Sequence, residues 1–214
     1  AGHRFGLALS TDNKLYSWGN NGGGQAGFLS PDGGGEYRIM GLCMREVDTR
    51  IGGVFTSQTR KKAVGGGYHG AGIDDQDRLW TWGTSVGGRR GPITGPYAIA
   101  QDNRPQIVAC NDPSRKWIDV FLGEYCSFFL RDDGRLFATG ENASGQLGVG
   151  NTTTQTDFVE VTAAGVPGWR FIHAEDTHTL GISLEGKLYG WGNNAFLRLG
   201  NASLTAPSYT TPQL

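Results

Sequence analysis

Two histidines and a cysteine occupy equivalent places in this sequence and have the chemistry for nucleophilic catalysis or metal binding. His69 and His178 each open a short apolar run, and Cys126 and Phe5 open two similar runs. A Cys–His couple activates the thiol only when the two side chains are within hydrogen-bond reach, so catalysis would require these places to converge. Because phenylalanine fills one of the four, packing is the favoured interpretation, and metal binding and catalysis remain alternatives.

Aspartates gather at two points that have the character of tight turns. They are Asp74, Asp75 and Asp77, and later Asp132 and Asp133. Paired carboxylates can bind a cation, but aspartate also stabilises turns by bonding to its own backbone. Their repeated position between two strand-like runs favours turn formation, so we predict no metal site.

Glycine-rich stretches at 22–24, 33–35 and 65–67 suggest phosphate loops, but none has the Gly-Lys-Ser/Thr signature or a strand-to-helix context. We therefore predict no nucleotide site, no cofactor and no catalytic residue. The cysteines are odd in number and none belongs to a C-x-x-C pair, which favours buried thiols over a disulfide or zinc site. They are Cys43, Cys110 and Cys126.

A repeated element holds all these residues. The stretch Leu15–Gly27 returns in altered form at Leu79–Gly91, Leu136–Gly148 and Leu188–Gly200. Each copy follows a short apolar run and a turn rich in Asp, Asn or Gly, which is typical of an antiparallel hairpin. The repeat is the main organising feature of the chain.

The repeat predicts an all-β fold, a β-propeller built from four units of about four strands each. A single four-stranded sheet cannot bury both faces, so neighbouring sheets must stack, and large rings beside small residues favour wedge-shaped blades. One domain, 1–214, would contain units at about 1–60, 61–117, 118–169 and 170–214, with an insertion at 28–60. The second-strand rings would be core rather than a ligand platform.

Composition restricts the classes of partner. The 214 residues have a net charge of -1 and include 36 glycines, which suits many tight turns. Near neutrality makes nucleic acid an unfavoured partner, and no apolar run is long enough to predict a membrane partner. The chain has no initiator Met or signal peptide, so a processed or truncated piece is one expectation.

The repeat resembles that of the regulator of chromosome condensation family, most closely over Gly140-Glu-Asn-Ala-Ser-Gly-Gln-Leu-Gly148. Unit two, with Gly88-Arg-Arg-Gly91, and unit four, with Leu197-Arg-Leu-Gly200, depart from it. The resemblance implies a non-enzymatic propeller, commonly of seven blades. Four units imply a fragment, a small ring, or partner chains that complete it.

We interpret the chain as a non-catalytic module that binds a protein through end-face loops and the 28–60 insertion, or as part of an assembly such as a viral or phage appendage. Alternatives are an exchange factor for a small GTPase and an extracellular enzyme inhibitor. Three asparagines, Asn142, Asn151 and Asn201, stand in N-x-S/T sequons that could be glycosylated in a secreted chain. The candidate partner-binding residues are His3, Arg4, Tyr68, Arg89, Arg90, Glu124, Tyr125, Asp176 and Thr177.

Overall fold

The structure is a computed structural model that describes residues 2–3, 5–11, 14–27, 40–46, 50–51, 54–55, 60–93 and 105–214. Most of the predicted insertion at 28–60 lies outside the described residues. Its described parts are strands, one of which joins the first sheet.

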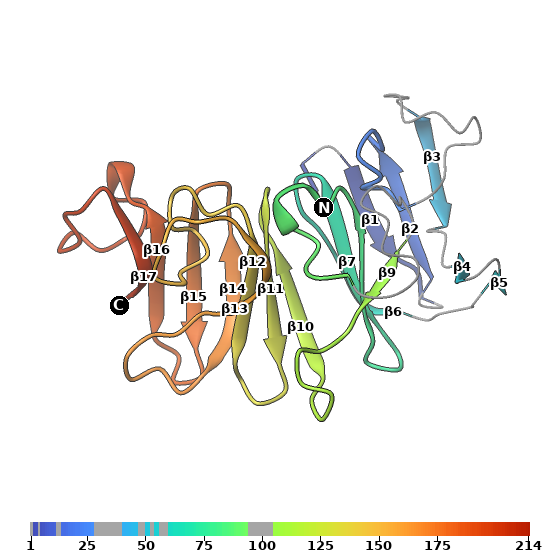
Figure 1. The fold of residues 1–214 in the computed structure, drawn as a ribbon. Helices are drawn as coiled ribbons and strands as arrows, with labels where there is room; N and C mark the ends of the chain where they lie inside the picture. Colours follow the sequence, from blue (N-terminus) through green and yellow to red (C-terminus); the bar gives the residue numbers. More distant parts are fainter. Residues whose placement is uncertain are drawn as a thin grey trace.

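The described chain forms antiparallel sheets that stand side by side in chain order (Figure 1). The first sheet contains β1 (Phe5–Leu9), β2 (Leu15–Gly19) and β3 (Met40–Glu46). The second contains β6 (Arg60–Gly65), β7 (His69–Asp74), β8 (Leu79–Gly83) and β9 (Gln106–Val108). The third contains β10 (Trp117–Leu122), β11 (Cys126–Arg131), β12 (Leu136–Gly140) and β13 (Gln155–Glu160). The fourth contains β14 (Trp169–Ala174), β15 (His178–Ser183), β16 (Leu188–Asn193) and β17 (Ser208–Gln213).

Short elements complete the described chain. β4 (Arg50–Ile51) and β5 (Val54–Phe55) pair with each other. Within the described residues, helical structure is limited to two 3-10 turns, η1 (Val86–Gly88) and η2 (Ala195–Leu197). The all-β prediction is thus confirmed. None of these described helices has the length or apolar character needed to cross a membrane.

The strand register makes the four repeats equivalent. The first residue of the strand that precedes each repeat pairs with the repeat's fifth residue, a glycine with positive φ: Phe5 with Gly19, His69 with Gly83, Cys126 with Gly140 and His178 with Gly192. At Gly140, a Cβ would lie 2.5 Å from the carbonyl oxygen of Tyr125. Glycine is therefore required here both for its left-handed backbone and for space.

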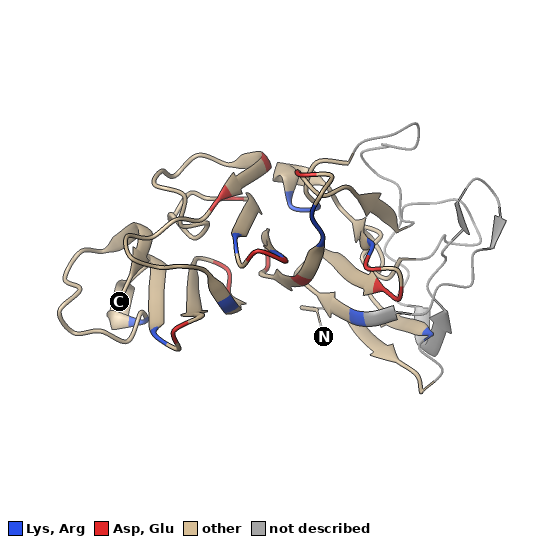
Figure 2. Cartoon of the chain, turned by 90° about the horizontal axis from the view of Figure 1, so that it is seen from below, with Lys and Arg blue, Asp and Glu red and all other residues tan. Residues whose placement is uncertain are grey.

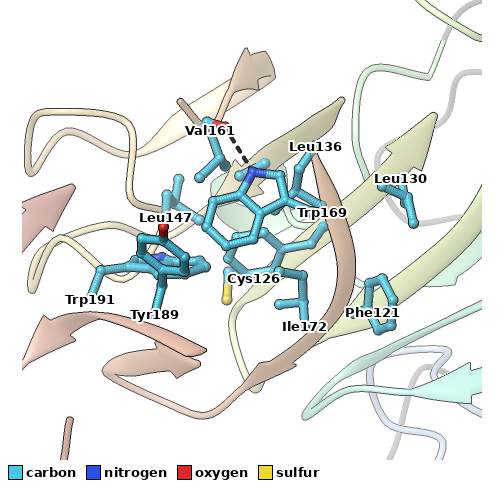
Figure 3. Packing of buried hydrophobic residues seen from close by; sticks show 12 residues of the cluster. Phe121, Cys126, Leu130, Leu136, Leu147, Val161, Trp169, Ile172, Tyr189 and Trp191 are labelled. Carbon is cyan, nitrogen blue, oxygen red and sulfur yellow. Dashed lines mark hydrogen bonds between the residues drawn. The ribbon is translucent and has the colours of Figure 1, made fainter. Parts of the chain in front are cut away.

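The core lies between neighbouring sheets. Leu136 of the third sheet packs in one buried cluster with Trp169, Tyr189 and Trp191 of the fourth (Figure 3). The rings of Trp169 and Trp191 meet edge to face with centroids 5.4 Å apart. The Trp169 indole donates a 3.2 Å hydrogen bond to the carbonyl of Val161, so its polar edge is satisfied inside the core. Tyr189 and Trp191 belong to the repeated stretch and are buried, as the sequence predicted, whereas Trp169 comes from the strand before it. The prediction is wrong for Trp18, which is 36% exposed.

Charged residues are sparse and interspersed over the described ribbon (Figure 2). Basic and acidic residues both occur in each half of the described ribbon (Figure 2), and the whole chain has a net charge of -1.

Candidate functional site

Two kinds of connection meet at one end of the sheets. The turn 66–68 leads into β7, and the loop after β8 starts beside it because His69 pairs with Gly83. Backbone hydrogen bonds join the two, from Thr84 N–H to the carbonyl of Tyr68 at 3.1 Å. The third sheet repeats this bond from Glu141 to Tyr125 at 3.0 Å. We call this end of the described sheets the end face.

Two tyrosines from neighbouring sheets meet on the end face. The rings of Tyr68 and Tyr125 stack with centroids 5.7 Å apart and an interplanar angle of 21°. The guanidinium of Arg89 lies 5.9 Å from the Tyr68 centroid and 5.0 Å from the Tyr125 centroid. Such cation–π contacts stabilise by about 0.5–2 kcal/mol, depending on desolvation. The second and third sheets are thus joined by an aromatic pair with a cation beside it.

Arg89 is held by its own loop and by the third sheet. Its side chain is only 5% exposed and forms an ion pair with Glu141, with Nη2 and Oε1 2.9 Å apart. Its Nε donates to the carbonyl of Val86 at 2.7 Å. Burial lowers the pKa of the Arg89 guanidinium, and the Glu141 carboxylate opposes that shift. The arginine therefore braces the tyrosines rather than offering an open charge.

The tyrosines border a hollow of about 360 Å³. It lies where loops of the first three sheets meet, and its wall combines rings, amides and backbone. Burial, followed by hydrogen bonds to Glu124 and Tyr68, raises the pKa of the Tyr125 hydroxyl, which therefore stays protonated at neutral pH. The lining residues are Asn20, Gly22, Gly23, Gln25, Tyr68, Thr84, Val86, Arg89 and Tyr125.

Other predicted site residues lie on the same face at greater distance. His3 forms a 3.2 Å contact with Glu124, between Nδ1 and Oε1. Thr177 accepts a hydrogen bond from Arg198 at 3.3 Å. Burial and then the Glu124 carboxylate raise the pKa of Asp176. None of these residues lines the hollow.

Two predicted residues fall elsewhere. Arg4 lies outside the described residues. Arg90 is fully buried, and its guanidinium donates to the carbonyls of Gly83 and Thr81 at 3.2 and 3.3 Å. Arg90 therefore fastens its loop to the end of β8 and presents no surface to a partner.

The histidine and cysteine positions stand apart, each in its own sheet. His69 Nε2 lies 2.8 Å from the hydroxyl of Ser127, which in turn donates to the carbonyl of Arg89. Burial, with Arg89 and Arg90, lowers the pKa of His69 to about 3. Burial raises the pKa of the Cys126 thiol to about 12, so this thiol is protonated and a poor nucleophile. Among the described residues, no three His, Cys, Asp or Glu side chains are placed to hold a metal ion.

Several lining residues were not expected from the sequence, although Asn20, Gln25 and Val86 all stand in the repeated loops. A signal existed, because these loops follow the second strand and must end beside the turns that were predicted. The sequon residue Asn142 is buried, and its amide donates to the carbonyl of Asn151 at 2.8 Å. This asparagine holds its loop together.

Comparison with known proteins finds a family model and relatives that match this chain. The model of the regulator of chromosome condensation (RCC1) repeat matches residues 1–25 and 117–146. Human HERC6, a probable E3 ubiquitin-protein ligase, is 27% identical over 209 residues, which cover 97% of this chain and 19% of HERC6. The chain thus spans about a fifth of that relative's length.

Solved structures show the same fold. Human WBSCR16 superposes with a TM-score of 0.79 at 24% identity, covering 100% of this chain and 52% of its own. Prp20p from Saccharomyces cerevisiae superposes with a TM-score of 0.78 at 18% identity, covering 99% of this chain and 48% of its own. The prediction of a β-propeller architecture is confirmed. This chain corresponds to about half of each solved chain.

Proposed function

Since the chain belongs to the regulator of chromosome condensation repeat family, we propose that it is a non-catalytic module that binds a protein partner through its end face. The observation that carries the proposal is the stacked pair of Tyr68 and Tyr125 beside an open hollow. Tyrosine is enriched at binding hot spots because it has a large apolar ring and a polar tip. The proposed surface excludes Arg90, which is buried.

The hollow has the make-up of a protein contact. Its lining includes apolar surface, from the tyrosine rings and from Val86, which is 66% exposed. The lining also includes polar groups, among them the amide of Asn20 and the hydroxyl of Thr84. Protein interfaces combine apolar and aromatic groups with polar groups in this way.

The site is also organised before binding. Arg89 is fixed by Glu141 and Val86 and lies beside both rings, so the rings have little rotamer freedom to lose. Ordering a free side chain at an interface opposes binding by about 0.5–1.5 kcal/mol. A braced aromatic pair avoids much of that loss, which supports a recognition role.

Similar proteins support a protein partner in general terms. The structure of Prp20p is described together with its binding to Gsp1p and histones, which are proteins. At 18% identity this likeness carries the fold alone, so the partner of this chain is a separate question. No described residue favours the alternative of an exchange factor or of an enzyme inhibitor. HERC6 shares about a fifth of its length with this chain, and its ligase activity is not part of the proposal.

The proposal extends to two wider roles. The 28–60 insertion is a second contact region in it, although most of this stretch lies outside the described residues. A structural part in a larger assembly, such as a viral appendage, would use the same contacts. Long loops on a rigid frame often carry partner-specific contacts.

Site-specific photo-crosslinking tests the end face. A photoreactive phenylalanine at Val86, beside the hollow, should capture a protein from extracts of the source cells. The same residue at Leu184, which is 54% exposed in the turn at the opposite end, serves as the matched control. Adding Tyr125→Ala should reduce capture at position 86 at least tenfold. Equal capture at both positions, or capture that survives Tyr125→Ala, would contradict the proposal.

A release assay separates the alternative function. A small GTPase loaded with fluorescent GDP would be mixed with the chain, and the rate of GDP release measured. We expect no acceleration. Catalytic acceleration that Tyr125→Ala abolishes would replace the proposed module with an exchange factor that uses the same face.

A further inference from the structure

One leucine of the repeat is exposed only in the fourth sheet. Leu15, Leu79 and Leu136 open β2, β8 and β12 and are 3%, 1% and 0% exposed. Each packs with residues of the following sheet, as Leu79 does with Trp117 and Leu136 does with Trp169. Leu188 opens β16 at the same place and is 55% exposed. The side of the fourth sheet that points away from the third, here called the distal face, thus keeps an apolar contact position that is uncovered.

The loop next to that face departs from the repeat in a second way. Gly88 and Gly145 stand at equivalent loop positions, with φ of 76° and 78°. Leu197 occupies this position in the fourth unit with φ of 55°, and Phe196 before it has φ of 60°. Two successive large residues in the left-handed region are strained. Phe196 is nonetheless 98% exposed and Leu197 is 52% exposed, so nothing in the described chain explains the strain by packing.

The presence of Leu197 in place of glycine restricts what can cover the distal face. A Cβ on Gly88 would lie 2.5 Å from the Cα of Thr156 in β13, and one on Gly145 would lie 3.1 Å from the Cα of Thr210 in β17. The outer strand of a following sheet therefore passes close over this loop position. A leucine there excludes an outer strand placed as β13 is. Whatever covers the distal face needs more room at that point.

The outer strand of the first sheet has a glycine at the corresponding position. Thr156 and Thr210 each follow a residue that pairs with the repeat glycine, Gln155 with Gly140 and Tyr209 with Gly192. In the first sheet Met40 pairs with Gly19, and the residue after Met40 is Gly41. Leu197 therefore stands where the second and third units have glycine. Gly41 stands where β13 and β17 have threonine.

The bulge in β3 adds to this fit. Between its paired positions, β3 runs from Met40 to Arg45 opposite Gly19 and Ser17. In the third sheet, β13 runs from Gln155 to Val159 opposite the equivalent residues of β12, Gly140 and Ala138. It uses one residue fewer than β3 does. An additional residue in a bulge bends the strand locally, at the place where Leu197 would need space.

We propose that the distal face of the fourth sheet binds the first sheet of a second copy of this chain, with Leu188 and Leu197 as its anchors. A head-to-tail contact made twice closes on itself when the rotation fits. The inference is independent of the end-face proposal, because it uses a different surface.

Analytical ultracentrifugation of the 214-residue chain tests this directly. We expect a concentration-dependent dimer that Leu188→Asp weakens at least tenfold while the far-ultraviolet spectrum is unchanged. Leu184→Asp, at another exposed leucine, in the turn between β15 and β16, should leave the dimer intact. A chain that stays monomeric up to about 100 μM, well above the usual range of specific association, overturns the proposal, as does equal weakening by both variants.

A second variant separates binding from folding. Leu197→Gly should remove backbone strain, so at dilutions where the chain is monomeric its Tm should rise by about 2–4 °C. The same variant should weaken the dimer, because an anchor is lost. In a Cys43→Ser background, Leu197→Cys with Gly41→Cys should give an interchain disulfide that neither change gives alone. An interchain disulfide formed by Leu197→Cys without Gly41→Cys, or a stronger dimer with Leu197→Gly, overturns the head-to-tail arrangement.

Discussion

The indole Nε1 of Trp82 donates a 2.8 Å hydrogen bond to the backbone carbonyl of Gln25, across the boundary between the second and first sheets. The same bond recurs at 2.8 Å from Trp191 to the carbonyl of Gln146, between the fourth and third sheets. Between the second and third sheets, the hydroxyl of Ser127 donates to the carbonyl of Arg89 instead. Every boundary in the described chain thus uses the carbonyl at one loop position.

Trp82→Phe should lower the free energy of unfolding by about 1–3 kcal/mol, because a buried acceptor loses its donor. Trp18→Phe is the matched control. Trp18 holds the same repeat position in the first sheet but is 36% exposed, and its loss should stay within about 0.5 kcal/mol. Urea unfolding followed by circular dichroism measures both. Equal losses in the two variants would show that the cross-sheet bond contributes nothing.

His69→Phe should flatten the dependence of stability on pH. His69 has a pKa of about 3 when folded and about 6.5 when unfolded. Between these two pKa values the unfolded chain binds more protons than the folded chain. The contribution of His69 to the free energy of unfolding is therefore fully present above pH 6.5 and is lost as the pH falls towards 3. The loss from this group between pH 7 and pH 5 is about 2 kcal/mol.

Phenylalanine suits the test because Phe5 fills the equivalent place in the first sheet and is buried. Denaturant midpoints would be compared between pH 5 and pH 7 for both chains. The steep loss below pH 4 should persist in the variant, because the ion pair with Arg131 lowers the pKa of Asp133 to about 2. An unchanged slope between pH 5 and pH 7 would show that His69 is not the group responsible.

Gly88→Ala should lower the Tm more than Gly165→Ala does. Both glycines have positive φ, at 76° and 73°, and the left-handed backbone alone costs about 1–2 kcal/mol for alanine. A Cβ at Gly165 meets nothing within 4 Å, whereas one at Gly88 would lie 2.5 Å from the Cα of Thr156. Overpacking should add about 1–3 kcal/mol at Gly88. Thermal unfolding of the two variants measures the difference, and equal Tm losses would mean that the third sheet yields freely at this contact.

Leu136→Ala and Leu188→Ala make the same change at the same repeat position. Truncating the buried Leu136 should lower the free energy of unfolding by about 2–5 kcal/mol. Leu188 is 55% exposed and should cost less than about 1 kcal/mol at dilutions where the chain is monomeric. Chemical unfolding at low protein concentration checks both values. A large loss at Leu188 under these conditions would mean that its side chain packs within its own chain.

The sequence predicted the local elements well because each hairpin is determined by short-range patterns. Alternating residues, a turn of Asp, Asn or Gly and a fixed glycine are enough to set the pairing of Phe5 with Gly19 and its three equivalents. The fold class followed from repetition, since identical units must pack in the same way. These features need no knowledge of distant contacts.

Residues that depend on the angle between sheets were harder to predict. Tyr68 and Tyr125 were each predicted as anchors, but their stacking depends on how two sheets rotate against each other. Arg89 and Arg90 are adjacent and of one type, yet one braces the tyrosines and the other is buried beneath its loop. Alignment of the repeats contains the missing signal, because Arg90 stands where the other units have Ala26, Leu147 and Leu199, which are all buried.

The shared loop carbonyl has a consequence for how such a protein can change over generations. The neighbouring sheet bonds to a main-chain oxygen, so this bond can form whichever side chain stands at that position. The four units already differ there, with Gln25, Arg89, Gln146 and Arg198. The side chain at this loop position can therefore change in one unit at a time while the backbone bond between the sheets is kept.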